Sequence, residues 1–251
     1  MSDPDGQRSG FTLIELIVSI AIVGVLASLA VNLTRGARSA AHKASCASNL
    51  RQLGIAVSLY LNDHHQNFPP YVERTEQGPI WYFGKESGGG GPEGERDLDR
   101  EAGPLYPYIQ QVGGIEVCPA FNYGNAIYKP KFKGASWAYG YNWRLGGLWT
   151  GRNPMNIAQL SNRSRVIVFG DCAQANTFQA PASPNNPMLE EFYIIDETFK
   201  TIHFRHGHRA NFLFADGHVE SKKMLEGTRD ERLESEALGR ITKEGSLEFL
   251  E

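Results

Sequence analysis

The sequence predicts an α+β protein in which one long N-terminal helix, half of it transmembrane, packs on an antiparallel β-sheet head. Three observations predict this fold. Residues 11–33 are almost entirely apolar, residues 34–64 carry apolar side chains at three- and four-residue steps, and strand-like runs fill the second half of the chain. Of the 251 residues, 41% are hydrophobic and 21% are charged, as in ordinary folded domains.

The apolar segment 11–33 is long enough to cross a bilayer. At about 1.5 Å per helical residue it spans roughly 35 Å. Its single ionisable side chain is Glu15. A carboxylate in hydrocarbon costs about 2.5–3.5 kcal/mol, so Glu15 either has a cationic partner or lies shallow enough to reach interfacial water.

A competing interpretation of this segment is a secretory signal peptide, cleaved near the small residues Ser28 and Ala30. The apolar run is long for a signal core, and the helical pattern continues beyond it. These two features favour a membrane helix.

Cleavage between Gly10 and Phe11 would place a free amino group four residues before Glu15. In a bundle of identical helices, that amine would neutralise the carboxylate of a neighbouring subunit. The segment Gly10-Phe11-Thr12-Leu13-Ile14-Glu15-Leu16 resembles the processing site of type IV pilins and type II secretion pseudopilins.

The resemblance implies that a prepilin peptidase, which is also an N-methyltransferase, removes residues 1–10 and methylates Phe11. It implies that Glu15 guides each subunit into a helical filament with other pilin-like subunits, on an inner-membrane assembly platform. The chain would then be a single-pass inner-membrane protein with an extracytoplasmic head. The charges depart from the family pattern, because Asp3 and Asp5 lie in the leader and Arg38 follows the span, so orientation depends on the motif.

Residues 34–67 are predicted to form the amphipathic half of the same helix, which docks on the head. The helix should run from about Thr12 to His64, and Phe68-Pro69-Pro70 should end it, since proline lacks the amide donor. The apolar positions that form the docking face are Ala37, Ala40, Ala41, Ala44, Ala47, Leu50, Leu53, Val57 and Leu61.

Residues 68–251 are predicted to form one globular head. Residues 84–103 combine four consecutive glycines with many charges, so we expect a mobile surface loop there. We expect strands at 116–119, 136–145, 165–169, 192–195 and 200–204, and one helix near 230–238. Residues 211–220 have the form of a β-hairpin around Asp216-Gly217, a strong signal for a tight two-residue turn.

The histidine-rich stretch 201–208 is the one plausible site for chemistry. His206, His208, Asp216 and His218 could offer nitrogen and oxygen ligands to zinc, and Asp171 and Cys172 could join them. The spacing matches no established metal motif. We favour a structural clamp instead, in which His206 fixes the segment that leads into the hairpin and Asp216 caps its turn.

His206, nine further residues and Asp216-Gly217 also resemble the C-terminal signature of a bacterial pseudopilin subfamily, the prepilin-type processing-associated domain. The same subfamily recurrently has an Asn-Leu-x-Gln stretch, here Asn49–Gln52, and a Cys-Pro segment, here Cys118-Pro119. The subfamily is defined by sequence more than by mechanism, so the resemblance implies no specific role for the signature.

The chain has three cysteines, too few for a disulfide framework. Cys46 on the docking face and Cys118 on the head could form a bridge worth about 4–5 kcal/mol by loop closure. The alternative, three separate buried thiols, remains equally open.

Composition and motifs limit the function classes. A net charge of −3 offers no electrostatic basis for binding nucleic acid. The sequence holds no nucleophile elbow, phosphate loop, zinc-protease motif or dinucleotide fingerprint, so we expect no enzyme and no cofactor. The preferred hypothesis is a structural pseudopilin subunit of a type II secretion or pilus-like filament. The alternative is a membrane-anchored binding module, or a metal-binding head, that acts without polymerisation.

Overall fold

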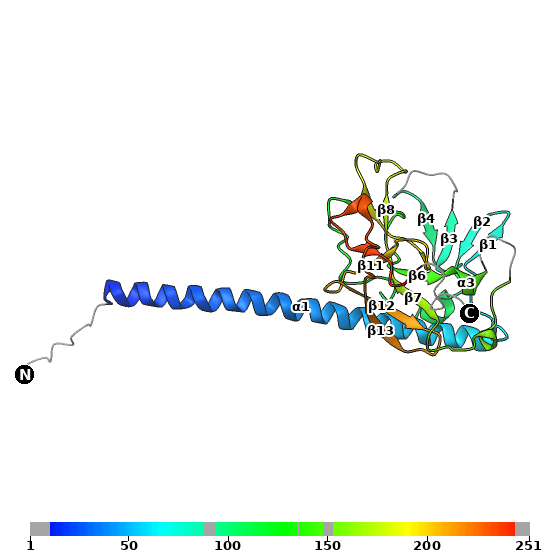
Figure 1. Ribbon diagram of the computed structural model, residues 1–251, viewed down its shortest axis with the longest axis horizontal. Coiled ribbons are helices and arrows are strands. Elements are labelled where there is room, and N and C mark those ends of the chain that lie inside the picture. Colours follow the sequence, from blue (N-terminus) through cyan, green and yellow to red (C-terminus); the bar gives the residue numbers. More distant parts are fainter. Residues whose placement is uncertain (1–10, 88–93, 135, 148–152, 244–251) are drawn as a thin grey trace, which may run out of the picture. The chain divides into compact units, whose positions relative to one another are not determined.

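The computed structural model describes residues 11–87, 94–134, 136–147 and 153–243, without the side chains of residues 31–33 and 35. The leader predicted at residues 1–10 lies outside these ranges. The chain divides into two compact units, residues 1–41 and 42–251, and each is described by itself. The α+β fold is confirmed, because one long helix is followed by a set of mixed β-sheets (Figure 1).

Helix α1 runs from Leu13 to Asp63, one residue inside each predicted end. Thr12 and Glu15 cap its first turn, as described below. The helix ends before the prolines, where His65 and Gln66 adopt φ angles of 54° and 66°. That left-handed conformation cannot continue a right-handed helix, and Phe68-Pro69-Pro70 then carries the chain away.

Of the predicted docking face of α1, the large apolar side chains in the second part are buried. Leu50, Leu53, Val57 and Leu61 are buried, and Cys46 joins them at the start of the stripe. The alanines before residue 42 are exposed. Alanine buries too little apolar area to define a face, so the larger side chains decide where packing begins.

The core of residues 42–251 is a five-stranded sheet with strand order β10-β6-β7-β12-β13. Strand β7 is buried along its whole length, as its apolar run predicts. β10 pairs with β6 in parallel, so the sheet is mixed and not purely antiparallel as predicted. The strand bounds are Tyr139–Asn142 for β6, Ile167–Asp171 for β7, Ile194–Ile195 for β10, Arg209–Phe214 for β12 and Val219–Lys223 for β13.

This sheet packs on residues 42–63 of α1. A Cβ atom at Gly54 would lie 2.8 Å from Leu213 Cδ1 on β12, so the helix approaches the sheet closely there. In Figure 1, β12 and β13 lie beside this part of the helix. On β6, a Cβ atom at Gly140 would lie 2.8 Å from Cys172 Sγ, so this strand also lies close to its neighbours.

The expected loop at 84–103 is partly a sheet. Two strands inside it, Gly84–Ser87 (β3) and Asp97–Asp99 (β4), pair antiparallel, and residues 88–93 between them lie outside the described ranges. The Glu86 carboxylate accepts hydrogen bonds from Trp81 Nε1 at 3.3 Å and from Arg96, which holds the two strands together. They complete a four-stranded sheet with Val72–Thr75 (β1) and Gly78–Trp81 (β2).

Two predicted elements are wrong. Residues 116–119 form turns and no strand, because Pro119 removes a donor and Cys118 O instead accepts the Phe121 N–H at 3.0 Å. Residues 230–238 contain only a short 3₁₀ turn, Glu231–Leu233 (η2), whose start is capped by the Asp230 side chain. The chain then pairs Leu238–Gly239 (β14) with Ile202–His203 (β11).

The remaining elements are short. A three-stranded sheet has the order β5-β9-β8, with β5 and β9 parallel. Its strands are Tyr128–Lys129 (β5), Gln174–Asn176 (β8) and Met188–Glu190 (β9). Three short helical turns lie elsewhere in the chain, at Tyr106–Ile109 (α2), Trp143–Gly146 (α3) and Ile157–Gln159 (η1).

The C-terminal hairpin of β12 and β13 is confirmed, but its turn type is not the predicted one. Gly217 N–H donates to Phe214 O and Phe214 N–H donates to His218 O, both at 2.9 Å. Gly217 has a φ of 89°, whereas Asp216 is not among the residues with positive φ. The connection is therefore a three-residue turn with glycine in the left-handed position.

Candidate functional site

The N-terminal sequence motif overlaps the start of helix α1, where Thr12 and Glu15 form hydrogen bonds with each other. The Thr12 backbone N–H and hydroxyl both donate to Glu15 Oε2, at 2.9 and 2.8 Å, and the Glu15 N–H donates to Thr12 Oγ1 at 3.3 Å. This reciprocal pair is a capping box, which satisfies amide groups that a helix start leaves unpaired. The spacing Thr-x-x-Glu could have revealed it from the sequence, and it means that Glu15 has a local role besides any role in assembly.

The apolar residues after Glu15 are exposed in the part of the chain that the structure describes. Leu13–Ala30 has a mean hydropathy of 2.5 and none of it is buried. By length and composition it can cross a membrane, although a signal sequence passes the same test. Phe11 and Ile14 are 82% and 70% exposed.

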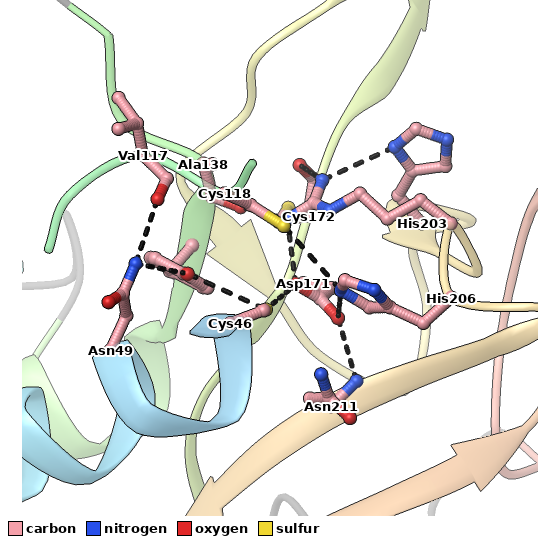
Figure 2. Close-up of polar contacts among 12 residues, drawn as sticks. Cys46, Asn49, Val117, Cys118, Ala138, Asp171, Cys172, His203, His206 and Asn211 are labelled. Carbon is pink, nitrogen blue, oxygen red and sulfur yellow. Dashed lines mark hydrogen bonds and ion pairs between the residues drawn. The ribbon is translucent and has the colours of Figure 1, made fainter. Parts of the chain in front are cut away.

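A second constellation lies inside the head, where Cys46, Cys118, Asp171 and His206 meet. Their candidate ligand atoms all lie within 4.8 Å of one another, and all four residues are buried. Among the residues that the structure describes, this is the group of three or more potential metal ligands that the fold brings together. Figure 2 shows the four side chains converging from α1, the turn at residue 118, β7 and the segment before β12.

Asp171 is the centre of this cluster. The register of β7 with β6 and β12 places it at the end of β7, opposite Tyr139. Its Oδ1 accepts hydrogen bonds from Arg205 Nη2 at 2.8 Å and from Cys46 Sγ at 3.1 Å. Its Oδ2 accepts the Asn211 N–H at 2.7 Å and lies 3.2 Å from His206 Nε2. Both carboxylate oxygens are therefore fully engaged.

The charges of the cluster depend on each other. Burial opposes ionisation of Asp171, but Arg205 and His206 hold its pKa below its usual range. Burial also disfavours the charged form of His206, yet its contacts with Asp171 and Cys118 raise its pKa to about 9. The hydrogen bond from Cys46 lowers the pKa of the Cys118 thiol, while burial raises that of Cys46.

Cys118 is positioned by contacts of its neighbours. Asn49 Nδ2 donates to Val117 O at 2.9 Å, and the Ala138 N–H donates to Glu116 O at 2.9 Å. Cys118 Sγ then lies 3.5 Å from His206 Nε2. The three segments singled out by the subfamily resemblance, at Asn49, Cys118 and His206, thus meet at one place (Figure 2).

The predicted metal set is not assembled. His206 turns inward to Asp171, whereas His208 is exposed and has a φ of 62°. Asp216 and His218 pair with each other on the exposed turn, with Oδ1 and Nδ1 2.6 Å apart. The Asp216 carboxylate also accepts the His218 N–H at 3.1 Å, a hydrogen bond within the turn of the hairpin.

The predictions about the three cysteines have different outcomes. Cys46 and Cys118 do come together, but both are free thiols, as is Cys172, so the bridge is absent from this structure. Cys172 lies outside the cluster, and its Sγ donates to Ile194 O at 3.2 Å. Sequence reasoning missed Arg205 as the main partner of Asp171, because nothing in the local pattern indicates that a charged side chain will turn inward to β7.

Comparison with known proteins bears mainly on the N-terminal region. Residues 6–31 match the family described as prokaryotic N-terminal methylation motif. The chain is 43% identical over 65 residues to the type II secretion system core protein G of Escherichia coli (strain K12), a match that covers 26% of this chain. The chain spans less than half of that relative, 44% of its length. No solved structure matches significantly.

Proposed function

We propose that this chain is a pseudopilin-like structural subunit. A prepilin peptidase cleaves it after Gly10 and methylates Phe11, and the subunit then joins a type II secretion or pilus-like filament through residues 11–33. The methylation-motif match at residues 6–31 and the similarity to core protein G support this proposal. The head is extracytoplasmic, and the partners are other pilin-like subunits and an inner-membrane assembly platform.

The observation that carries the proposal is the exposed apolar surface of Leu13–Ala30, which lies within the methylation-motif match at residues 6–31. Such a surface is stable only in lipid or against other apolar helices. Before assembly the bilayer covers it, and in the filament the same face packs on neighbouring copies. The same helix surface therefore serves first for membrane insertion and then for polymerisation.

Glu15 then has two roles that can be separated. It caps its own helix through Thr12, and we infer that its charge also pairs with the Phe11 amine of a neighbouring subunit. Capping requires only a side chain that accepts a hydrogen bond, which glutamine provides as well. Pairing with an amine requires the negative charge, which sets the axial register of the subunits.

The test compares Glu15→Gln, Glu15→Ala and Thr12→Ala in the native host. The mature N-terminus is read by mass spectrometry and filaments are detected by electron microscopy. We expect N-methylated Phe11 in the wild type, filament loss in both Glu15 variants, and filaments in Thr12→Ala, which keeps the charge. Normal filaments from Glu15→Gln would reject the charge-pairing mechanism, and an N-terminus at Met1 or beyond Ala30 would reject the proposed processing.

The alternative of a membrane-anchored head that acts alone gains no specific support. The buried cluster has no open face at which a substrate could bind, since Cys46, Cys118 and Asp171 are each 0% exposed. We therefore propose a structural role and no catalytic one.

A further inference from the structure

We propose that Cys46, Cys118, Asp171 and His206 form a structural zinc site, in which two thiolates, one carboxylate and one imidazole hold a single Zn²⁺. This inference goes beyond filament assembly, which requires nothing from the interior of the head. It also differs from the metal set considered from the sequence, since it shares only His206 and Asp171 with that set and takes its sulfur ligands from Cys46 and Cys118.

The distances between the ligand atoms agree with a zinc tetrahedron. Zn–S bonds of about 2.3 Å and Zn–N and Zn–O bonds of about 2.0–2.1 Å give edges of roughly 3.6 Å between sulfur and nitrogen and roughly 3.3 Å between nitrogen and oxygen. Cys118 Sγ and His206 Nε2 are 3.5 Å apart, and His206 Nε2 and Asp171 Oδ2 are 3.2 Å apart. These two edges already match a zinc tetrahedron, and the four ligand atoms all lie within 4.8 Å of one another.

The chemistry of the donor set favours zinc over a plain hydrogen-bonded cluster. Thiols are weak hydrogen-bond donors and acceptors, and the sulfur contacts with His206 and with Tyr139 Oη are long, at 3.5 Å each. Apart from the 3.1 Å hydrogen bond that Cys46 Sγ donates to Asp171 Oδ1, the two buried thiols therefore gain little as hydrogen-bonding groups. As thiolates on zinc the same atoms form strong bonds, and a set with two sulfurs selects zinc over calcium or magnesium.

The charges of a zinc-bound cluster balance. Two thiolates and the Asp171 carboxylate carry three negative charges, whereas Zn²⁺ and the Arg205 guanidinium carry three positive ones. Arg205 is part of this arrangement, because its Nη2 lies 2.8 Å from Asp171 Oδ1 and its side chain is only 3% exposed. A buried site that is neutral overall avoids most of the cost of burying its separate charges.

Groups around Asp171 and beside Cys118 hold these two ligands in place. Arg205 and the Asn211 N–H hold the carboxylate, and Asn49 holds the backbone next to Cys118. Hydrogen bonds of this kind fix the direction of ligand lone pairs before the metal binds. All four positions of the tetrahedron are supplied by protein and are buried, which is the arrangement of a structural site rather than a catalytic one.

Zinc at this point would join segments that are distant in the sequence. The ligands come from the docking part of α1, from the turn at residue 118, from the end of β7 and from the turn before β12. The segment around Cys118 has neither helix nor strand to hold it. Coordination would therefore contribute directly to the folding free energy of the head.

The experiment uses the full chain in detergent, purified under reducing conditions and then dialysed against zinc. We expect about one zinc per chain by plasma mass spectrometry, and a lower melting temperature after chelation that zinc restores. Replacement by Co²⁺ should produce the intense visible bands of tetrahedral cobalt and a thiolate-to-metal charge-transfer band in the near ultraviolet.

Variants identify the ligands. Cys118→Ser and His206→Gln should retain less than roughly a tenth of the wild-type zinc, because each removes one of four bonds. Cys172→Ser is the matched control, since it replaces a buried thiol that lies outside the cluster, and it should bind zinc as the wild type does. If the ligand variants fail to fold, the cobalt spectrum of the wild type decides alone.

Three results would overturn the inference. The first is a folded wild-type chain without stoichiometric zinc, and the second is undiminished zinc in Cys118→Ser. The third is a Cys46–Cys118 disulfide in chain alkylated directly in native membranes, because oxidised sulfurs cannot act as thiolate ligands.

Discussion

Two carboxylates of this chain, Glu15 and Asp171, are placed in opposite ways. Glu15 lies at the exposed start of α1, where its hydrogen bonds come from Thr12 three residues away. Asp171 is fully buried and binds groups 34 to 125 residues away in the sequence, Arg205 and Cys46 among them. The ionic and hydrogen-bond partners of Asp171 all belong to residues 42–251, whereas the proposed ionic partner of Glu15 comes from another subunit.

The apolar residues of the two regions differ in the same way. From Leu13 to Ala30 none of the helix is buried, whereas Leu50 and Leu53 are 0% exposed. Leu13–Ala30 is apolar almost throughout, whereas residues 42–63 carry polar side chains between the buried ones. The first part of the helix thus exposes its apolar side chains, whereas the second part buries them in the core of the head.

Asp171→Asn should have the largest effect on this comparison. The substitution leaves the Arg205 charge buried without its partner, and breaking a buried pair in this way costs about 3–5 kcal/mol. Denaturant unfolding of the full chain in detergent, followed by tryptophan fluorescence, measures the loss. A cost below about 1 kcal/mol would mean that Arg205 reaches solvent and that the cluster is not the fixed centre described above.

Leu53→Ala tests the apolar half of the comparison. Removing a fully buried leucine side chain should lower the free energy of unfolding by about 3 kcal/mol. Ile55→Ala is the control on the same helix, because Ile55 is 61% exposed and its truncation should change stability by less than about 0.5 kcal/mol. Equal effects of the two substitutions would contradict the docking face.

Glu191→Gln sharpens the contrast between acids, because Glu191 is a buried carboxyl without a strong cationic partner. Burial raises its pKa to about 7, although the Trp137 N–H and Tyr128 hydroxyl donate to it. The folded state thus holds the proton more tightly than the unfolded state, so wild-type stability falls as pH rises from about 4.5 to about 7. Over this window the variant should gain about 2–3 kcal/mol relative to the wild type, measured by thermal melts at several pH values.

A constant difference between Glu191→Gln and the wild type across that pH window would show that Glu191 keeps an ordinary pKa. The comparison must be made between the two chains at each pH, because His206 and Asp171 contribute pH dependence to both.

Asp216→Asn should have the smallest effect. Asp216 belongs to the same signature as His206, but it lies on an exposed turn and pairs with a half-exposed histidine. Surface pairs contribute about 0–1 kcal/mol, and asparagine can still accept the His218 N–H across the turn. A loss in the unfolding measurement as large as that of Asp171→Asn would show that the turn carries the role assigned here to the cluster.

Much of the fold could be predicted because its signals are local. The helix ends, the buried run of β7 and the Asp216-Gly217 hairpin each depend on side chains within a few residues. The errors also have local causes. The strand expected at 116–119 and the loop expected at 84–103 were judged by composition, but a turn at Pro119 and the contacts of Glu86 decide these segments.

The candidate cluster was predictable only in part. The sequence marked His206 as a special position and paired Cys46 with Cys118, but it had no means of joining these two observations. Asp171 was considered as an additional member, and Arg205 was not assigned to it. The contacts of Asp171 with Cys46 and Arg205 cross long stretches of chain, and periodicity carries no information about such distances.

The sequence by itself determined the membrane-length apolar segment, the N-terminal methylation motif that overlaps it and the helix that continues to Asp63, because each depends on the order of neighbouring residues. Only the tertiary structure decided which residue pairs with each buried charged side chain. Register between β6, β7 and β12 places Asp171 within reach of two cysteines, a histidine and an arginine, and strand register is set by the packing of the whole sheet.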